Sequence, residues 1–352
     1  MTGRTIASRP LRLLAHLLAA ALVVSACSGE SAAVPSPTPS PSPSPSPTPS
    51  PTPEPGPISP LNGAELAPGT DLDRRAIGVK IDNHPSARPQ VGLAEADVVV
   101  EILVEGGLTR LLAVFHSRDP DGVGPIRSGR PTDASIAAAL GAPLAISGAQ
   151  GWVQSHIVNQ GVDLIGHTKS TMYRTSSRRA PHNLMTDLSR LRGNADSRGL
   201  PDEPPQSWLP FGPLAPGAEP AASLSLSMGS RTTAGWAWKD GSWQRSTDGA
   251  AHATVTQDGE VKRIRVDTVL VLEMKSYTAR PPGSGSSVPA TETVGSGPAW
   301  VFADGKFTKG TWKRDSITDA FELVNYDGRR MPVPPGRLWV ELLPAGRTIT
   351  IS

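Results

Sequence analysis

Hydrophobic and polar positions follow three different patterns along this chain. The first is a single apolar run over residues 13–24. The second covers residues 34–60, where proline occupies nearly every second position. The third starts near Leu61, where apolar runs of strand length alternate with helical stretches and Gly- or Pro-rich breaks. These patterns predict a leader, a stiff spacer and a folded body.

The leader, residues 1–26, has the features of a lipoprotein signal peptide. A basic start with Arg4, Arg9 and Arg12 precedes the apolar run, which is shorter than the ~20 residues of a membrane-spanning helix. The run ends in small residues directly before Cys27, as in a bacterial lipobox. We expect Cys27 to carry a diacylglycerol with palmitate-type chains. The alternative is an ordinary secretory signal with an incidental cysteine.

Cysteine count and charge narrow the roles of the mature chain. Cys27 is the only cysteine, so no intramolecular disulfide can form and no thiol nucleophile remains after lipidation. The formal net charge is +2, but the leader holds three arginines and no acid, which leaves 31 basic and 32 acidic residues. This balance gives no support for nucleic-acid binding. We expect an extracytoplasmic protein held at the outer face of the cell membrane by its lipid, with a cell-wall polymer or an envelope protein as a further partner.

Composition divides the remaining chain into a stalk and two domains. A Pro- and Ser-rich stalk is predicted over residues 27–60, and its Pro-rich part, residues 34–60, would reach about 80 Å at ~3.1 Å per residue. A mixed α/β N-terminal domain is predicted over residues 61–199, and a Pro-rich linker over 200–222. Short apolar runs separated by Asp-Gly turns predict a small β-rich C-terminal domain over 223–352. The expected fold class is therefore α+β.

Local patterns predict the elements of the N-terminal domain. Residues 76–82 are typical of a strand, and two β-rich runs around Gly106-Gly107 predict a hairpin. Thr132 and Asn183 would each cap a helix. Three helices are predicted, over residues 132–140, 151–161 and 183–193.

The chain resembles a known family in motifs that occur in a fixed order. The N-terminal part is similar to the YerB-like envelope lipoproteins of Gram-positive bacteria in "VKIDNHPSARPQVGLAEADVVVEILVEGGLTRLLAVF", "GPIRSGRP" and "RRAPHNL". The C-terminal part resembles the second domain of that family in "DTVLVLEMK", "GTWKR" and "PPGRLWVELLP". The resemblance covers most of residues 75–345. It implies a two-domain lipoprotein of the cell surface and no defined reaction.

The predicted hairpin gathers polar groups on one face. With a two-residue turn at Gly106-Gly107, side chains of alternate residues on both strands point to the same side. These side chains are Asp97, Glu101, Glu105, Arg110 and His116. A core-facing strand does not normally carry three acids, so this face is either a polar pocket or a solvated face with ion pairs worth ~0.2–1 kcal/mol each.

The segment "GPIRSGRPT" places arginines just before a predicted helix. Arg127, Ser128 and Arg130 precede Thr132. A helix N-terminus and two guanidinium groups together favour a carboxylate or phosphate ligand. The alternative is that these arginines pair with the acids of the hairpin.

Two loops complete the candidate set. Asp82, Asn83 and His84 follow a predicted strand, where ligand-binding residues are common, although Asp and Asn there also hydrogen-bond their own backbone. His182 is a candidate acid/base group or anion contact, or a structural histidine. The candidate binding residues are Asp82, Asn83, His84, Arg88, Glu101, Glu105, Arg110, Arg127, Ser128, Arg130, His182 and Asn183.

The sequence leaves two classes of function open. The first is a binding or scaffold module for an anionic or sugar-containing envelope ligand. Trp236, Trp238 and Trp243 suit either sugar stacking or core packing in such a module. No nucleophile elbow, phosphate-binding loop, dinucleotide motif or zinc-ligand spacing occurs, so we expect no cofactor or metal and assign no catalytic residue.

The second class is a cell-wall-acting hydrolase or transferase with a Glu/His site. Glu101 or Glu105 would be the acid or base and His182 its partner. Two carboxylates four residues apart on a strand lie ~13 Å apart, more than the ~5–9.5 Å of a glycosidase pair. The spacing therefore favours the binding module.

Overall fold

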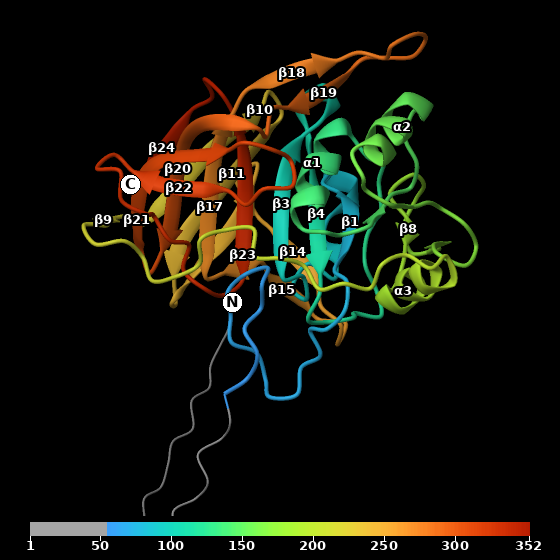
Figure 1. Cartoon of the computed structure of the whole chain (residues 1–352), viewed down its shortest axis with the longest axis horizontal. Helices are drawn as coiled ribbons and strands as arrows, with labels where there is room; N and C mark the ends of the chain where they lie inside the picture. Colours follow the sequence, from blue (N-terminus) through green and yellow to red (C-terminus); the bar gives the residue numbers. More distant parts are fainter. Residues whose placement is uncertain (1–54) are drawn as a thin grey trace, which may run out of the picture. The chain divides into compact units, whose positions relative to one another are not determined.

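One mixed β-sheet of eleven strands runs through both predicted domains (Figure 1). The structure is a computed structural model that describes residues 55–352, which belong to one compact unit, Pro53–Ser352. The predicted signal peptide, Cys27 and the predicted stalk up to residue 54 lie outside the described residues, so each of them stays a prediction. None of the described helices is long and apolar enough to cross a membrane.

The strands at the centre of this sheet are apolar along nearly their whole length. β3 (Val98–Leu103) and β23 (Leu338–Pro344) are parallel neighbours, although they come from opposite ends of the sequence. Every residue of β23 is buried, as expected for a strand covered on both faces. The other strands of the sheet are β1 (Ile77–Asp82), β4 (Thr109–Phe115), β5 (Leu144–Ala145), β6 (Leu164–Ile165), β9 (Glu219–Pro220), β17 (Thr268–Met274), β20 (Gly295–Ala303), β21 (Lys306–Arg314) and β22 (Glu322–Asn325). Their order is β22-β21-β20-β17-β23-β3-β4-β1-β5-β6, with β9 beside β21.

Helices cover one face of the sheet. α1 (Pro131–Ala139) and α2 (Gly151–Asn159) bury Ile136 and other apolar side chains against residues such as Val100 and Leu112. A hairpin of β18 (Ser276–Ala279) and β19 (Val288–Thr291) extends this layer beside α1 (Figure 1). The result is the first of two hydrophobic cores.

A second sheet covers the opposite face. It consists of β10 (Ser223–Gly229), β11 (Thr232–Lys239), β12 (Ser242–Thr247), β13 (Ala250–Ala251), β16 (Arg265–Val266) and β24 (Ile349–Ile351). Its apolar side chains, with those of α3 (Leu188–Ser197), form the second core around Val99 and Phe115. With two cores of its own, the unit has what a chain segment needs to fold independently.

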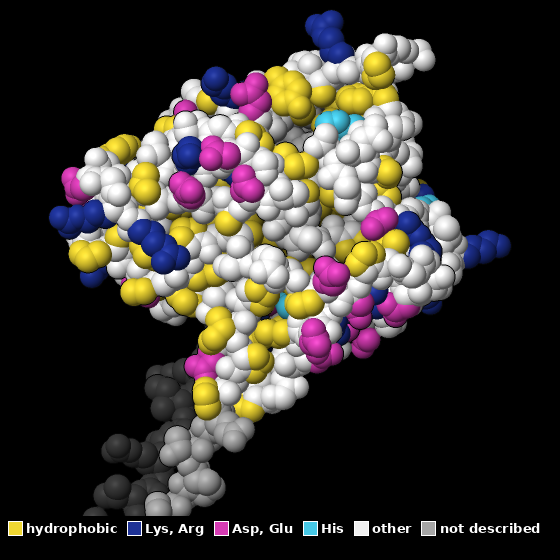
Figure 2. Space-filling model, viewed as in Figure 1, with side chains coloured by type: hydrophobic (Ala, Val, Ile, Leu, Met, Phe, Trp, Pro, Cys, Tyr) yellow, Lys and Arg dark blue, Asp and Glu magenta, His cyan; other side chains and the backbone are white. Residues whose placement is uncertain are grey.

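Short elements complete the described chain. Three strands form a separate small sheet: β2 (Gln90–Val91), β14 (Ala253–Val255) and β15 (Val261–Arg263). β7 (Tyr173–Arg174) pairs with β8 (Leu184–Met185), and two 3₁₀ turns are η1 (Pro85–Ala87) and η2 (Glu105–Gly107). Figure 2 shows charged side chains of both signs on one face, with Asp and Glu side chains gathered at the lower right.

The fold is richer in β-structure than the α+β expectation. The described residues contain three α-helices and 24 strands. α1 begins at Pro131 with Arg130 as its N-cap, so Thr132 lies inside the helix. The third helix starts five residues later than predicted, with Asp187 as its N-cap, because the residues before it pair in β8. Asn183 as a helix cap was therefore wrong.

The Pro-rich segment 200–222 packs against the body of the protein. The indole Nε1–H of Trp208 donates to the carbonyl oxygen of Leu61 at 2.9 Å, and its ring contacts Phe321 edge-on. Trp208 is buried in the first core. This segment is therefore part of the folded unit rather than a free connector.

Two of the three tryptophans considered for sugar stacking are core residues. Trp236 and Trp243 are buried in the second core, whereas Trp238 is half-buried. The stacking interpretation is wrong for Trp236 and Trp243, because the second sheet turns them toward the first.

Candidate functional site

The β3–β4 hairpin has a three-residue turn rather than the predicted two. η2 supplies Glu105–Gly107 as the turn, and the N–H of Val104 donates to the carbonyl oxygen of Leu108 at 2.8 Å. Gly106 and Gly107 have φ values of 70° and 69°, a left-handed conformation that glycine adopts without strain. The extra turn residue shifts the register by one.

This register separates residues that were predicted to share a face. Ile102 faces Arg110, and Glu101 faces Leu111. Since successive side chains alternate between faces, Glu101 and Arg110 lie on opposite faces of the sheet. The predicted single polar face with five members was therefore wrong.

Asp97 and His116 stabilise the far end of the hairpin. The carboxylate Oδ2 of Asp97 accepts a hydrogen bond from the backbone N–H of His116 at 2.7 Å. The His116 ring is buried and lies against the carbonyl oxygens of Leu72 and Arg74. These two residues have a structural role.

A second group of predicted residues meets at the end of β1. Asp82 is 3% exposed. Its Oδ2 accepts hydrogen bonds from Arg127 Nε at 2.8 Å and His182 Nδ1 at 2.7 Å, and its Oδ1 accepts one from the backbone N–H of His84 at 3.0 Å. We call the following residues the arginine–histidine site: Asp82, His84, Glu105, Arg110, Arg127, Arg130 and His182.

Backbone contacts bring the segments of this site together. The N–H of Asp82 donates to Pro125 O, and the N–H of Arg127 donates to Lys80 O, both at 2.8 Å. These bonds hold the chain before α1 against the end of β1. The guanidinium of Arg178 donates to the carbonyl oxygen of Ala87 at 2.9 Å and ties the loop that carries His182 to η1.

Two imidazole rings stack at the edge of the site. The rings of His84 and His182 have centroids 4.6 Å apart and an angle of 19° between their planes. His84 Nδ1 accepts a hydrogen bond from the N–H of Ser86 at 3.1 Å, so the neutral ring carries its proton on Nε2. Burial, with the neighbouring His182 and Arg127, lowers the pKa of His84 below its ordinary value.

The buried carboxylate of Asp82 is ionised. Burial opposes its charge, but the hydrogen bond from His84 and the nearby Arg127 and His182 outweigh that effect and lower the pKa of Asp82. The negative charge of Asp82 holds the guanidinium of Arg127 and keeps the proton of His182 on Nδ1. The other ring nitrogen of His182, Nε2, takes no part in the bond to Asp82.

Arg110 differs from the other arginines of the site. Arg130 forms a bidentate pair with Glu105, with distances of 2.7 and 2.8 Å. Arg110 Nη1 donates to the carbonyl oxygen of Ser128 at 2.7 Å, and among residues 55–352 Arg110 joins no ion pair. Burial and the charge of Arg130 lower its pKa to about 10, so it stays protonated at neutral pH. Arg110 is a half-buried cation without a matching acid.

The N-terminus of α1, predicted as an anion seat, already has an internal acid. The carboxylate of Asp133 accepts from the backbone N–H of Arg130 at 2.7 Å and from Lys80 Nζ at 2.5 Å. The structure thus shows the alternative, in which these arginines pair with acids. Arg130 pairs with Glu105 of the hairpin, whereas Arg127 pairs with Asp82 of β1.

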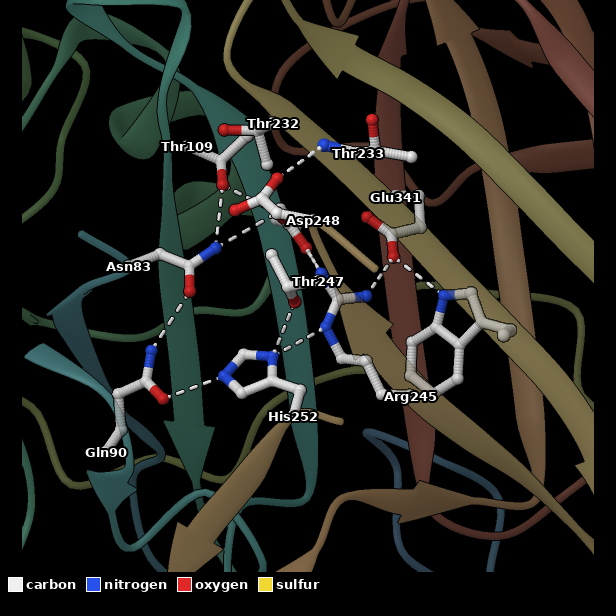
Figure 3. A network of polar contacts seen from close by, with 12 residues as sticks. Asn83, Gln90, Thr109, Thr232, Thr233, Arg245, Thr247, Asp248, His252 and Glu341 are labelled. Atoms are coloured by element: carbon white, nitrogen blue, oxygen red, sulfur yellow. Dashed lines mark hydrogen bonds and ion pairs between the residues drawn. The ribbon is translucent and has the colours of Figure 1, made fainter. Parts of the chain in front are cut away.

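Asn83 belongs to a separate, buried network (Figure 3). Buried Glu101 and half-buried Arg88 both bind Asn83. Asn83 follows Asp82 on the strand, so its side chain points to the opposite face. Asn83 Nδ2 donates to Thr109 Oγ1 at 2.8 Å and Glu101 Oε1 at 3.2 Å. Arg88 Nε donates to Asn83 Oδ1 at 3.2 Å. These predicted site residues are structural.

Two glutamates share one arginine inside this network. Glu101 and Glu341 are register partners on β3 and β23, and both are fully buried. Arg245 of β12 donates to both carboxylates, to Glu341 Oε1 at 2.7 Å and to Glu101 Oε2. Its guanidinium lies 5.0 Å from the ring centroid of Trp236 and 4.4 Å from that of Trp339. The network therefore joins three strands from both parts of the chain.

Glu341 makes the stability of the fold depend on pH. Burial, then the charge of Glu101, raises the pKa of Glu341 to about 8. Between its ordinary pKa near 4.5 and 8, the folded state keeps a proton that the unfolded state releases, so stability falls as pH rises through this window. Glu341→Gln should therefore reduce the loss of unfolding free energy between pH 5 and pH 8 by at least ~1 kcal/mol. Urea denaturation at pH 5 and pH 8 measures the free energy of unfolding of the wild type and the variant. An equal loss between the two pH values in both proteins would contradict this prediction.

The remaining predicted residues support their own loops. Asn183 Oδ1 accepts from Arg174 Nη1 at 2.7 Å, and its Nδ2 donates to Thr175 O at 3.1 Å. The hydroxyls of Ser128 and Ser147 lie 3.5 Å apart. Neither serine contacts His182, so neither is placed as a nucleophile for it.

The arginine–histidine site has the groups for two kinds of chemistry. A half-buried cation and two ring nitrogens suit the binding of a carboxylate or phosphate. A carboxylate that orients an imidazole also suits proton transfer. Within residues 55–352, no cluster of three or more His, Cys, Asp or Glu side chains is arranged to hold a metal ion.

Comparisons with known proteins match both parts of the chain. Residues 61–201 match the N-terminal domain, and residues 223–340 the C-terminal domain, of a family described as "Protein of unknown function (DUF3048)". A relative from Bacillus subtilis (strain 168), named "Putative lipoprotein YerB", is 26% identical over 293 residues, which cover 80% of this chain and 84% of that protein. The crystal structure of the YerB protein from Bacillus subtilis has a TM-score of 0.72 at 23% identity and covers 83% of this chain and 99% of its own. The chain therefore belongs to the DUF3048 family and is a homologue of YerB.

Proposed function

We propose that this protein is a lipid-anchored component of the cell envelope that binds an anionic envelope ligand at the arginine–histidine site, as a binding or scaffold module. Arg110 carries this proposal, because a half-buried guanidinium without an acidic partner needs an anion to satisfy it. The name of the YerB relative as a lipoprotein supports the anchored location.

The surroundings of Arg110 favour an anion over a cation. In the arginine–histidine site, Arg127 pairs with Asp82 and Arg130 pairs with Glu105. The positive charge of Arg110 is therefore not balanced by an acid of the site. Arg231 of the second sheet adds an exposed cation beside the hairpin turn. His182, whose side chain is 15% exposed, gives a ligand access to an imidazole. A carboxylate or phosphate of a wall polymer has the matching chemistry.

A sedimentation assay tests this function. The compact unit, residues 53–352, is incubated with purified cell wall, and bound and free protein are separated by centrifugation. Saturable binding without release of wall fragments is the expected result. Absence of binding to intact wall would contradict the proposal.

The alternative is a hydrolase or transferase that uses His182 as its base. The bond between Asp82 and His182 Nδ1 favours it, because an oriented imidazole can activate water. In this case the assay would release soluble fragments, and His182→Gln would abolish the release. A catalytic Glu101 has no place in this alternative, since Glu101 is fully buried.

Ligand binding should strengthen as pH falls. His84 is neutral at pH 7 because its pKa lies below the ordinary value, so protonation at lower pH adds a positive charge beside His182. Wild-type affinity for the wall should rise more between pH 7 and pH 5 than the affinity of His84→Gln. Equal rises in the two proteins would show that His84 does not face the ligand.

A further inference from the structure

A cavity lies where the two family segments meet. It has a volume of about 350 Å³, within the ~300–1,000 Å³ range of small-molecule sites. Its walls come from β3 and the loop before it on one side, and from β14, β15, β16 and β23 on the other. Figure 1 shows β14, β15 and β23 close to one another in this part of the molecule. No residue of the arginine–histidine site lines this cavity.

The inner wall of the cavity is apolar and contains one unsatisfied donor. Leu93, Val99, Ile264 and Leu338 line it and are buried. Trp339 also lines it and is 1% exposed, yet its indole Nε1–H has no hydrogen-bond partner. This inner wall therefore suits the apolar part of a ligand.

The rim of the cavity is cationic. Its lining includes four basic side chains and no acid: Lys262, Arg263, Arg265 and Arg337. Three of them also pair with surface acids outside the lining, and Lys262, for example, contacts Glu260 at 2.7 Å. Arg263 is half-buried, donates to the carbonyl oxygen of Arg245 at 2.5 Å, and joins no ion pair among the described residues. Arg263 is thus the cation best placed to receive an anion.

We propose that this cavity binds a small amphipathic anion, an apolar chain or ring that ends in a carboxylate or phosphate. The apolar part packs on Val99, Leu338 and the face of Trp339. The anionic group pairs with Arg263 at the rim. Charge complementarity and the apolar wall together select this class over neutral lipids and free phosphate.

Titration calorimetry on residues 53–352 tests the ligand class. The probes are octanoate and octyl phosphate, with octanol and inorganic phosphate as matched halves of the ligand. Saturable one-to-one binding of at least one anionic amphiphile is expected, with octanol bound ~10-fold or more weakly and inorganic phosphate not detectably. The anion that binds with the higher affinity shows whether the cavity prefers a carboxylate or a phosphate. Failure of both to bind, or equal binding of octanol, would overturn the proposal.

Two variants place the binding in this cavity. Ala96→Trp fills the cavity from its lining and should abolish binding, whereas Arg263→Met should weaken it ~10-fold. Lys309→Met, which removes an exposed pair between Lys309 on β21 and Glu219 on β9, is the control and should bind as the wild type does. Circular dichroism confirms that each variant folds. Unchanged affinity in folded Arg263→Met or Ala96→Trp would overturn the site, and this result would leave the arginine–histidine site untouched.

Discussion

Replacement of Arg245 by methionine should lower the free energy of unfolding by about 3–5 kcal/mol. Arg245 is fully buried and binds the carboxylates of Glu101 and Glu341, which are register partners on adjacent strands. Its removal leaves the two acidic groups facing each other in a buried site without solvent or a counter-ion. Urea denaturation followed by circular dichroism measures the loss.

A matched surface variant separates burial from the loss of an arginine. Arg337→Met removes an ion pair with Asp267 in which the arginine side chain is 51% exposed, so a loss below ~1 kcal/mol is expected. Combining Arg245→Met with Glu101→Gln and Glu341→Gln should recover part of the stability, because the two buried acids that lost their cationic partner are then absent. Equal losses in Arg245→Met and Arg337→Met would contradict the buried-charge explanation.

Arg110→Met should weaken binding to purified cell wall by ~10-fold or more while the fold stays intact. A hydrogen bond to a charged group contributes ~1.5–3 kcal/mol, and each ~1.4 kcal/mol is a factor of ten in affinity. Arg110 makes a single bond to the carbonyl oxygen of Ser128, so its loss costs the fold little. A binding isotherm on wild type and variant measures the effect.

Lys309→Met controls for a general loss of positive charge, since Lys309 of β21 is exposed and pairs with Glu219 of β9. Its affinity should match the wild type. If Arg110→Met and Lys309→Met weaken binding equally, the ligand is attracted by net charge and does not occupy the arginine–histidine site.

Local sequence patterns were sufficient for β1, β3, β4 and α1. Residues 76–82 were expected as a strand, and β1 occupies Ile77–Asp82. The apolar runs around Gly106-Gly107 pair as β3 and β4. These elements are predictable because the period of the apolar positions depends only on the local backbone.

Long-range pairing could not be read from those patterns. β3 pairs in parallel with β23, more than 200 residues later in the chain, and this pairing merges the two segments into one sheet. Nothing in either apolar run specifies its neighbour. The one-residue register error has a local cause, since two glycines fit a two-residue or a three-residue turn equally well.

The site was predictable where residues share an element, and less so where they come from distant loops. Asp82 and His84 were expected at a strand end and do meet His182 there. Asn83 lies between them and points to the opposite face, which the alternation of a strand could have indicated. Arg245 and Glu341 were missed, although a lone glutamate within "LWVELLP", as within "VVVEIL", signals a buried charge that requires a partner.

Binding of residues 53–352 to intact cell wall, compared with wall from which the anionic polymers have been chemically stripped, tests the central claim most directly. The account predicts saturable binding to intact wall that weakens with added salt, and a large loss of binding to stripped wall. Equal binding to both preparations would show that Arg110 and its neighbours do not receive an anionic wall ligand, and it would contradict the proposed function.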